Sequence, residues 1–350
     1  MLARVRRTLS PGKVVAGLAI GLFVTSAAQA QTAAPLWPSN TFRVIAGALP
    51  GSAYDAHSRL VARHIGRHLP GSPNVIVSNL AGAGSLTLAT HLAANGPHDG
   101  STIGGIISGL PSTLVLKPEI SPLRPEGLVW VGSISSETSV FTLWHTAPAK
   151  SLADLFTTPV ILGGTTQGTA NTDFPPALNE VFGFKTKVVA GYKSASVVAL
   201  AMERGEVDGN GGTNLSSVYS QSKAFVDDGR LKIIGQYGLK PHPSIPDVPL
   251  ILDLAKSPDD RALLELFTSR EDFGRPFITS PQVSKERLAL LRASFNKLAE
   301  DAEFLADAKR MQTEISLTTG DELTEMANKL SATKPEILQR ARRILDSTGK

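Results

Sequence analysis

The sequence predicts an α/β protein of two lobes. Short apolar runs rich in β-branched residues alternate with stretches that repeat apolar residues every three or four positions, from residue 42 to residue 236. A Pro-rich stretch then runs from Pro241 to Pro249, and mostly helical sequence follows it. The chain has 350 residues, and one domain usually holds about 100–200. Two α/β lobes that meet at a Pro-rich crossing are therefore expected.

The first part of the alternation contains three strands and two helices. Strands are expected at residues 42–46, 75–77 and 102–107, and helices at residues 53–69 and 85–94. The first helix carries one apolar face, and Pro70-Gly71 ends it. Strand–helix–strand order predicts parallel strands with right-handed crossovers.

The second part begins near Val140. Strands are expected at residues 140–144, 160–162, 187–190 and 232–236, and helices at residues 151–156, 172–181 and 194–204. Ser151 is a candidate N-cap, and Gly205 ends the last of these helices. Beyond Pro249, helices are expected at residues 259–269, 284–299, 302–311 and 335–345, the last opened by Pro335. Ligand binding is expected in the cleft between the lobes.

The N-terminus has the pattern of a secretory signal peptide over residues 1–30. Four basic side chains precede an apolar run from Val14 to Ala28, and Ala28-Gln29-Ala30 is an A-x-A cleavage site. The run is shorter than the roughly 20 residues that a membrane span needs. We expect cleavage after Ala30 and a periplasmic protein. The whole chain has a net charge of +4, all of it in this leader, so the neutral remainder gives no indication of nucleic-acid binding.

Signals for catalysis are weak. The chain has no cysteine, which excludes disulfides, thiolate metal sites and cysteine nucleophiles. There is no G-x-S-x-G motif, and Gly82-Ala83-Gly84 lacks the third glycine of a dinucleotide loop because Thr87 stands there. His57, His64 and His68 share one helical stripe, which we interpret as a partly solvated face rather than a metal site. We therefore expect no catalytic residue, no metal and no cofactor.

Seven segments, in order along the chain, resemble the substrate-binding proteins of tripartite tricarboxylate transporters, the Bug-type extracytoplasmic receptors. They include a strand followed by Leu49-Pro50-Gly51-Ser52-Ala53-Tyr54-Asp55, similar to the family's P-G-G-x-x-D loop, and Val77–Ser85, similar to V-x-N-x-x-G-A-G-G/S. Ser52 replaces the second glycine of the family loop, and Leu80-Ala81 departs from the family's second segment. The other five segments are His98–Gly100, Leu178–Tyr192, Ala201–Gly209, Ile245–Pro249 and Phe273–Pro276.

The resemblance implies a type II periplasmic-binding-protein fold with a hinge. Residues 40–138 plus 245–350 would form lobe 1, and residues 139–244 would form lobe 2. The ligand would be a small carboxylate-bearing solute, the protein partners would be membrane transporter subunits, and we expect a monomer. Two alternatives stay open: a periplasmic sensory receptor of the same fold that signals to a membrane kinase, and an exported α/β enzyme.

The candidate binding residues lie where strands end, because the carboxyl ends of strands face the ligand crevice in open α/β sheets. A loop that leads into a helix N-terminus suits a carboxylate, although Pro50–Ala53 also reads as a tight turn with Ser52 as N-cap. Neither Pro50–Ala53 nor Thr165–Thr169 contains Lys or Arg, so an anion would be held by N–H and O–H donors. Asp208 lies in a turn, which favours a capping role for it. The candidates are Leu49, Gly51, Ser52, Ala53, Tyr54, Asp55, Ser108, Gly109, Thr165, Thr166, Gln167, Gly168, Thr169, Gly191, Tyr192 and Asp208.

Overall fold

The computed structural model describes residue 37 and residues 40–166 and 168–348. The expected leader at residues 1–30 and the candidate Gln167 lie outside the described residues. Within the described part of the chain, no helix is both long and apolar enough to cross a membrane.

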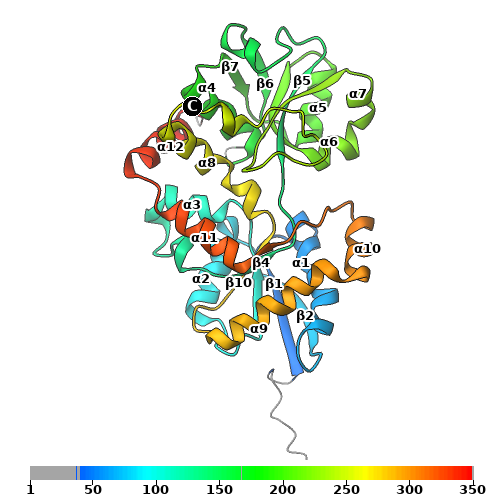
Figure 1. Ribbon diagram of the computed structural model, residues 1–350, viewed down its shortest axis with the longest axis vertical. Coiled ribbons are helices and arrows are strands. Elements are labelled where there is room, and N and C mark those ends of the chain that lie inside the picture. The colour runs from blue at the N-terminus through cyan, green and yellow to red at the C-terminus, as the bar shows by residue number, and fades with distance from the viewer. Residues whose placement is uncertain (1–36, 38–39, 167, 349–350) are drawn as a thin grey trace, which may run out of the picture. The chain divides into compact units, whose positions relative to one another are not determined.

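The first sheet has the strand order β11-β4-β10-β3-β1-β2 (Figure 1). β1 pairs in parallel with β2 and β3, whereas β10 runs antiparallel to β3 and β4. A strand from late in the chain therefore lies between strands from its beginning. The bounds are β1 Thr41–Ala46, β2 Asn74–Asn79, β3 Thr102–Gly105, β4 Val129–Ser133, β10 Pro276–Thr279 and β11 Thr318–Thr319.

The second sheet has the order β7-β6-β8-β5-β9. β6 is parallel to β7 and β8, and β5 is antiparallel to β8 and β9. The expected parallel pairing is thus confirmed within each set of consecutive βαβ units, but both sheets also contain antiparallel pairs. The bounds are β5 Ser139–Trp144, β6 Val160–Gly163, β7 Thr186–Val189, β8 Gly209–Asn214 and β9 Leu231–Gln236.

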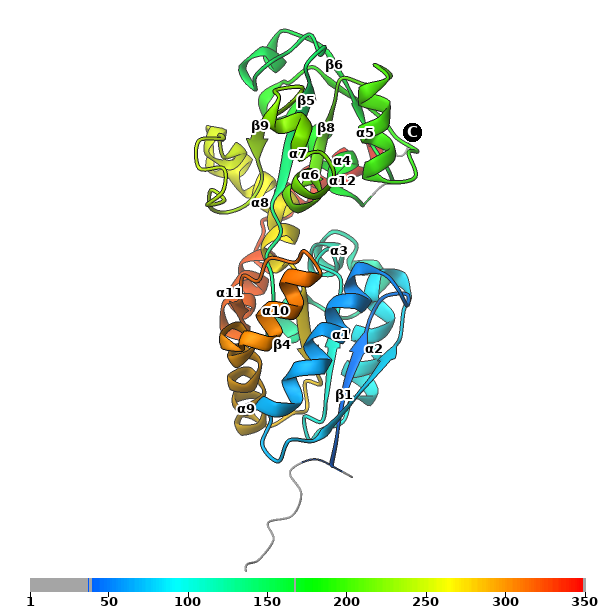
Figure 2. The same ribbon diagram turned by 90° about the vertical axis from the view of Figure 1, so that its right-hand side faces the viewer.

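Helices cover both sheets. α1 packs on β1 and β2 and also lies beside α10, as Figure 2 shows. α4 packs on β8, and both α8 and α12 pack on α4. The helices are α1 Ala53–Ile65, α2 Leu86–Asn95, α3 Leu110–Leu116, α4 Ala170–Phe182, α5 Ala195–Glu203, α6 Leu215–Gln221, α7 Lys223–Asp227, α8 Pro258–Phe273, α9 Lys285–Asn296, α10 Ala302–Arg310, α11 Gly320–Ser331 and α12 Pro335–Thr348.

Each sheet buries both faces. One cluster of buried side chains, including Phe42, Leu60 and Phe295, covers one face of the first sheet. A second cluster starts on the opposite face at Leu88 and continues without a break to Leu162 of the second sheet. A third covers the remaining face of the second sheet. Apolar burial of this kind is the main stabilising contribution to such a fold.

Two connections between strands cross from one sheet to the other, and the chain crosses again between α11, which packs on β4, and α12, which packs on α4. Residues 134–138 connect β4 to β5, and a longer segment that contains α8 connects β9 to β10. The two crossings are joined, because the Glu137 amide donates a hydrogen bond of 2.9 Å to the Glu271 carbonyl. They are the positions where a hinge between the sheets would bend.

The Pro-rich stretch Pro241–Pro249 does not form the crossing between the lobes that was expected of it. The buried side-chain amide of Gln236 donates to the carbonyls of Ile245 (3.1 Å) and Val248 (2.7 Å). The stretch therefore folds back over the end of β9, and α8 provides the crossing that follows it. The lobe boundaries expected at residues 138/139 and 244/245 stay a prediction.

Candidate functional site

The loop from β1 to α1 is held by its own polar groups. Ser52 is the N-cap of α1, and its Oγ accepts from the Asp55 amide at 3.3 Å. The Gly51 amide donates to Asp55 Oδ2 at 2.8 Å, and Gly51 has a φ of +80°. The capping role considered for Ser52 is thus present, and Leu49 beside it is exposed.

Asp55 fastens this loop to the sheet. Its buried carboxylate also accepts from Arg59 Nε at 3.0 Å and from Asn79 Nδ2 at 2.8 Å. Burial would raise the pKa of Asp55, but the hydrogen bonds from Arg59, Gly51 and Asn79 outweigh it and hold the pKa below its usual value. Asp55 is therefore an ionised, fully engaged acceptor.

Tyr54 joins this loop to the loop after β3. Its hydroxyl lies 2.9 Å from Ser108 Oγ and accepts from the Ser108 amide at 3.1 Å. The guanidinium carbon of Arg275 lies 4.3 Å from the centre of the Tyr54 ring, a cation–π distance. Gly109 follows as the N-cap of α3. The two strand ends are brought together as expected, and an arginine that was not among the candidates stands beside them.

A polar cavity of about 470 Å³ opens at this point. It is bordered by elements of both sheets: the start of α1, the crossing before β5, the start of α6 and the segment before β11. Of the sequence candidates only Ala53 lines it. The lining comprises Ala53, His57, Ser135, Ser136, Glu137, Thr138, Asn214, Leu215, Ser216, Ser217, Tyr219, Ser220, His242, Ser244, Arg275, Met311, Gln312, Thr313 and Glu314.

Arg275 is the central charged group of this cavity. Its side chain is only 10% exposed and pairs with Glu137, which also accepts from Asn214 Nδ2 at 2.8 Å. Arg275 Nε is buried and has no hydrogen-bond partner among the described residues. A buried guanidinium with an unused donor is a strong site for an oxyanion. The signal in the sequence was its position in the segment Phe273–Pro276.

His57 faces the same cavity in its neutral form. Its Nδ1 lies 2.5 Å from the Ala53 carbonyl, which can only accept, so Nε2 accepts from the Thr313 hydroxyl at 3.1 Å. Burial, together with the nearby Arg275 charge, lowers the pKa of His57 to about 4. His57 therefore adds no positive charge to the cavity at neutral pH.

Glu271 lies behind Glu137. Burial, and then the charge of Glu137, raises the pKa of Glu271 to about 8. Glu271 is mostly protonated at neutral pH, so Glu137 rather than Glu271 supplies the negative charge opposite Arg275.

The loop from β6 to α4 is closed on itself. The hydroxyls of Thr165 and Thr169 both donate to Asn171 Oδ1, at 3.0 and 2.8 Å, and the Thr166 carbonyl accepts from the Thr169 amide at 3.2 Å. The Gly168 amide donates to Asp173 Oδ1 at 3.1 Å. These bonds fix the loop but leave few free donors in this state.

Arg270 flanks that loop. Its Nη1 donates to the Gly168 carbonyl at 2.7 Å, and its Nη2 lies 3.4 Å from Asp173 Oδ2. Burial raises the pKa of Asp173, and Arg270 opposes this rise. The two candidate loops lack basic residues of their own, but α8 and the residues after it place Arg270 and Arg275 beside them. Binding of an anion by the N–H and O–H donors of these loops stays a prediction, to which the two arginines add charged donors.

Gly191 and Tyr192 join the β6 loop, as their position at a strand end predicted. The Gly191 amide donates to the Thr165 carbonyl at 2.9 Å, and the Tyr192 amide donates to the Gly164 carbonyl at 3.2 Å.

Asp208 does not join the β6 loop. Its carboxylate accepts from the Ile161 amide at 2.7 Å, at the amino end of β8, whereas the loops follow the carboxyl ends of β6 and β7. Asp208 thus has a structural contact with the neighbouring strand rather than a helix-capping one, and a contact with ligand stays a prediction.

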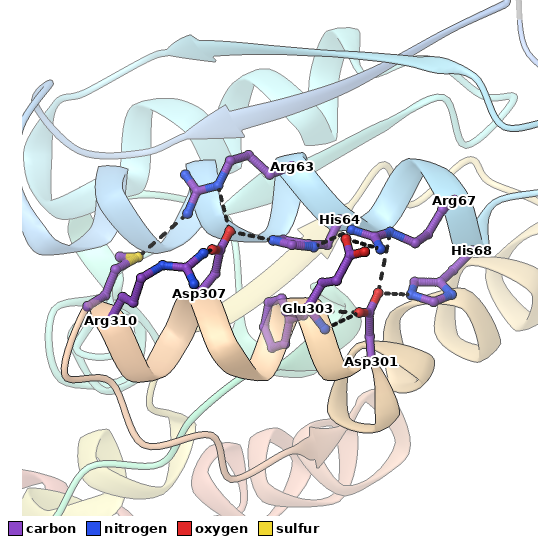
Figure 3. A network of polar contacts seen from close by, with 10 residues as sticks. Arg63, His64, Arg67, His68, Asp301, Glu303, Asp307 and Arg310 are labelled. Carbon is purple, nitrogen blue, oxygen red and sulfur yellow. Dashed lines mark hydrogen bonds and ion pairs between the residues drawn. The ribbon is translucent and has the colours of Figure 1, made fainter.

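Of the histidine stripe, His64 and His68 lie at the contact of α1 and the turn after it with α10 and its N-cap (Figure 3). His64 Nε2 lies 2.7 Å from Asp307 Oδ2, and His68 Nε2 lies 2.7 Å from Asp301 Oδ2. His57 and His64 are buried, so the expectation of a partly solvated face is wrong for them. Among the described residues, no group of His, Asp or Glu side chains could hold a metal ion.

Known proteins resemble this chain in sequence and in fold. No family model matches the chain. A UPF0065 protein from the tcbD–tcbE intergenic region of Pseudomonas sp. strain P51 is 25% identical over 251 residues, which are 70% of this chain and 72% of that protein. A TctC solute-binding protein from Polaromonas has a TM-score of 0.68 at 16% identity and covers 89% of this chain and 99% of its own. The chain has the two-lobed fold of the TctC-type solute-binding proteins.

The resemblance noted in the seven sequence segments is thereby confirmed. MatC of Rhodopseudomonas palustris, solved with bound malate, has the same fold with a TM-score of 0.54 at 15% identity, over 87% of this chain and 98% of MatC. The TctC-like fold extends over both sheets, since nearly all of each neighbour's chain is covered.

Proposed function

We propose that this chain is an extracytoplasmic solute-binding protein that captures a small carboxylate-bearing solute and delivers it to a tripartite tricarboxylate-type membrane transporter. The observation that carries the proposal is Arg275, a mostly buried guanidinium whose residue lines a polar cavity bordered by both sheets. The malate bound to the related fold of MatC supports the same class of ligand.

In this proposal one ligand carboxylate binds at Arg275 and the N-terminus of α1, next to Tyr54 and Ser108. The described residues of the loop Thr165–Thr169, with Gly191 and Tyr192, do not line the cavity at Arg275, and in this proposal the loop meets the other end of the ligand when the lobes close. Each hydrogen bond to a charged acceptor contributes roughly 1.5–3 kcal/mol, so a few convergent donors suffice for micromolar binding after the costs of association. A ligand that touches both lobes, residues 40–138 plus 245–350 and residues 139–244, favours the closed state.

The proposal includes export and the absence of chemistry on the solute. The leader would be cleaved after Ala30, so N-terminal sequencing of periplasmic protein should begin at Gln31. Intact full-length protein in the cytoplasm would contradict export. The bound solute should be recovered unchanged after long incubation, and turnover would instead favour the exported enzyme.

The experiment that tests the proposed function is a thermal-shift panel. Dicarboxylates, tricarboxylates, aromatic acids, amino acids, sugars and metal cations are added separately to the purified protein. We expect one class of carboxylate to raise the Tm, because only the folded protein binds it. Stabilisation by sugars or cations alone would contradict the proposal.

A further inference from the structure

A second cavity, of about 330 Å³, lies between α8, α11 and the segment that joins α11 to α12. Its walls are mostly apolar and include Ala262, Leu266, Phe273, Met326 and Leu330. Ligand pockets of small molecules typically have about 300–1,000 Å³ and apolar walls with a few polar groups. The cavity is thus large enough for one small molecule.

This cavity is separate from the one at Arg275. Ala262, Leu266, Ser269 and Phe273 recur every three or four residues and therefore share one face of α8. Arg270, on another face of α8, contacts Gly168. No residue lines both cavities among the described residues. An occupant of the second cavity would leave the first one free.

Most polar groups around the second cavity are already paired. Lys329 Nζ lies 2.6 Å from Glu265, and Lys334 Nζ lies 2.8 Å from Asp259. The Ser269 hydroxyl donates to the Leu266 carbonyl and lies 2.9 Å from Ser112 Oγ. These groups therefore leave few free hydrogen-bond donors or acceptors for a ligand.

Asp272 is different. Its Oδ2 is buried and has no hydrogen-bond partner among the described residues, although Asp272 lines the cavity. The amides of Leu239 and Asp272 donate to this carboxylate, but an oxygen removed from water without a donor still costs free energy, which a cationic donor would recover. Asp259, Glu265 and Asp272 also outnumber the basic residues of the lining, Lys329 and Lys334. The cavity therefore suits a ligand that joins a positively charged group to an apolar hydrocarbon part.

We propose that this cavity binds a small apolar monoamine. The hydrocarbon part packs against Leu266, Phe273, Met326 and Leu330, and the ammonium donates to the Asp272 carboxylate. This site takes a cation, so it is distinct in chemistry as well as in place from the carboxylate site at Arg275.

The pH dependence of binding follows from Asp272. Burial raises the pKa of Asp272 to about 6, with a further rise from Glu265, against the amides of Leu239 and Asp272 and the charge of Lys329, which lower it. Asp272 is therefore ionised at pH 7.5 and mostly protonated at pH 5. Binding of an ammonium should weaken as the pH falls between these values.

The test is calorimetric titration of the full-length protein with phenethylamine. We expect saturable binding at pH 7.5, a loss of about ten- to hundredfold in affinity for Asp272→Asn, and weaker binding of 2-phenylethanol, which has the same body without the charge. Asp253→Asn, at an exposed carboxylate that does not line the cavity, is the control and should bind as the original protein does.

A second variant keeps the test decisive if Asp272→Asn does not fold. Ala262→Leu fills the cavity without changing its charge and should also weaken phenethylamine binding at least tenfold. Equal binding by either folded variant, no saturable binding at pH 7.5, or an affinity for the alcohol equal to that for the amine would overturn the proposal.

Discussion

Gly274 allows the backbone to approach residues 134–138 closely and so positions the Arg275 side chain. It ends α8 with φ +60° and ψ −107°, and a Cβ at this position would lie 1.7 Å from the Ser135 carbonyl oxygen. No side chain fits there, because the crossing residues 134–138 pass directly over this glycine. The close approach lets the Arg275 amide donate to Ser135 and brings its guanidinium to Glu137.

We predict that Gly274→Ala lowers the free energy of unfolding by at least about 3 kcal/mol, since it adds a steric clash to the backbone strain. Gly183→Ala is the matched control. Gly183 also has a positive φ, +74°, but a Cβ there would meet no atom within 4 Å, so we expect a loss of only about 1 kcal/mol. Urea denaturation measures both. Equal losses would show that the contact with Ser135 is not restrictive.

His57 predicts a dependence of stability on pH. Its pKa is about 4 in the folded protein and 6.5 without burial, so the unfolded chain binds more protons between these values. The contribution of neutral His57 to the free energy of unfolding is complete above pH 6.5. It is lost as the pH falls through 4, by about 3 kcal/mol at most. We expect His57→Gln to show a flatter decline in urea denaturation over this range. A variant with the same pH dependence as the original protein would contradict the assignment of His57.

At the level of single residues the sequence predicted the loops better than the charges. Leu49–Asp55, Ser108 and Thr165–Thr169 lie at strand ends, as their position in the βαβ pattern indicates. Arg275 was not identified, because its contact with Tyr54 joins residues 221 positions apart that no local pattern connects. Asp208 was included for its place in a turn, and its partner on β6 could not be known without the strand pairing.

Among the elements, four strands were missed: β4, although Val129-Trp130-Val131 is an apolar run, and β8, β10 and β11. β8 reads Gly-Asn-Gly-Gly-Thr-Asn, and glycine is unfavourable in strands. Packing requires it there, because a Cβ at Gly211 would lie 2.3 Å from Pro175 Cγ and one at Gly212 would lie 2.6 Å from the Ala170 carbonyl carbon. α4 thus lies so close to the middle of the second sheet that only a residue without a Cβ fits beneath it. β10 was missed because it has only four residues, Pro276–Thr279.

The contact between α1 and α10 depends on charged side chains that meet across it. Asp307 on α10 interacts with Arg63 at 3.2 Å and His64 at 2.7 Å on α1, and also with Arg310 (Figure 3). Burial, and then the charge of Arg67, lowers the pKa of His64. Around Asp307 the network therefore combines one carboxylate with a mostly neutral histidine and two arginines.

We predict that Asp307→Asn lowers the free energy of unfolding by about 1–3 kcal/mol, because the half-buried donors lose a charged acceptor. The control is Asp228→Asn, which breaks an ion pair with Arg230 whose side chains are 43% and 47% exposed, so it should cost clearly less than Asp307→Asn. Thermal and urea denaturation provide the values. A larger loss for Asp228→Asn would argue against the importance of the α1–α10 contact.

At the scale of the whole molecule, one apolar cluster continues from the first sheet to the second. Closure around a ligand must therefore bend the two crossings while this cluster stays packed, which favours a hinge motion over separation of the sheets. We predict that a saturating carboxylate lowers the radius of gyration measured by solution X-ray scattering. An unchanged radius at saturation would leave capture between two lobes without support.

The measurement that tests the central claim most directly is calorimetric titration of the stabilising carboxylate into the original protein, Arg275→Gln and Arg275→Lys. We predict micromolar binding to the original protein and a loss of about ten- to hundredfold for Arg275→Gln, which removes the charged donors. Arg275→Lys keeps the charge and should lose less. Arg230→Gln, an exposed arginine at 47% side-chain exposure, should bind normally. Wild-type affinity in a folded Arg275→Gln variant would contradict the assignment of this arginine as the anion-binding group.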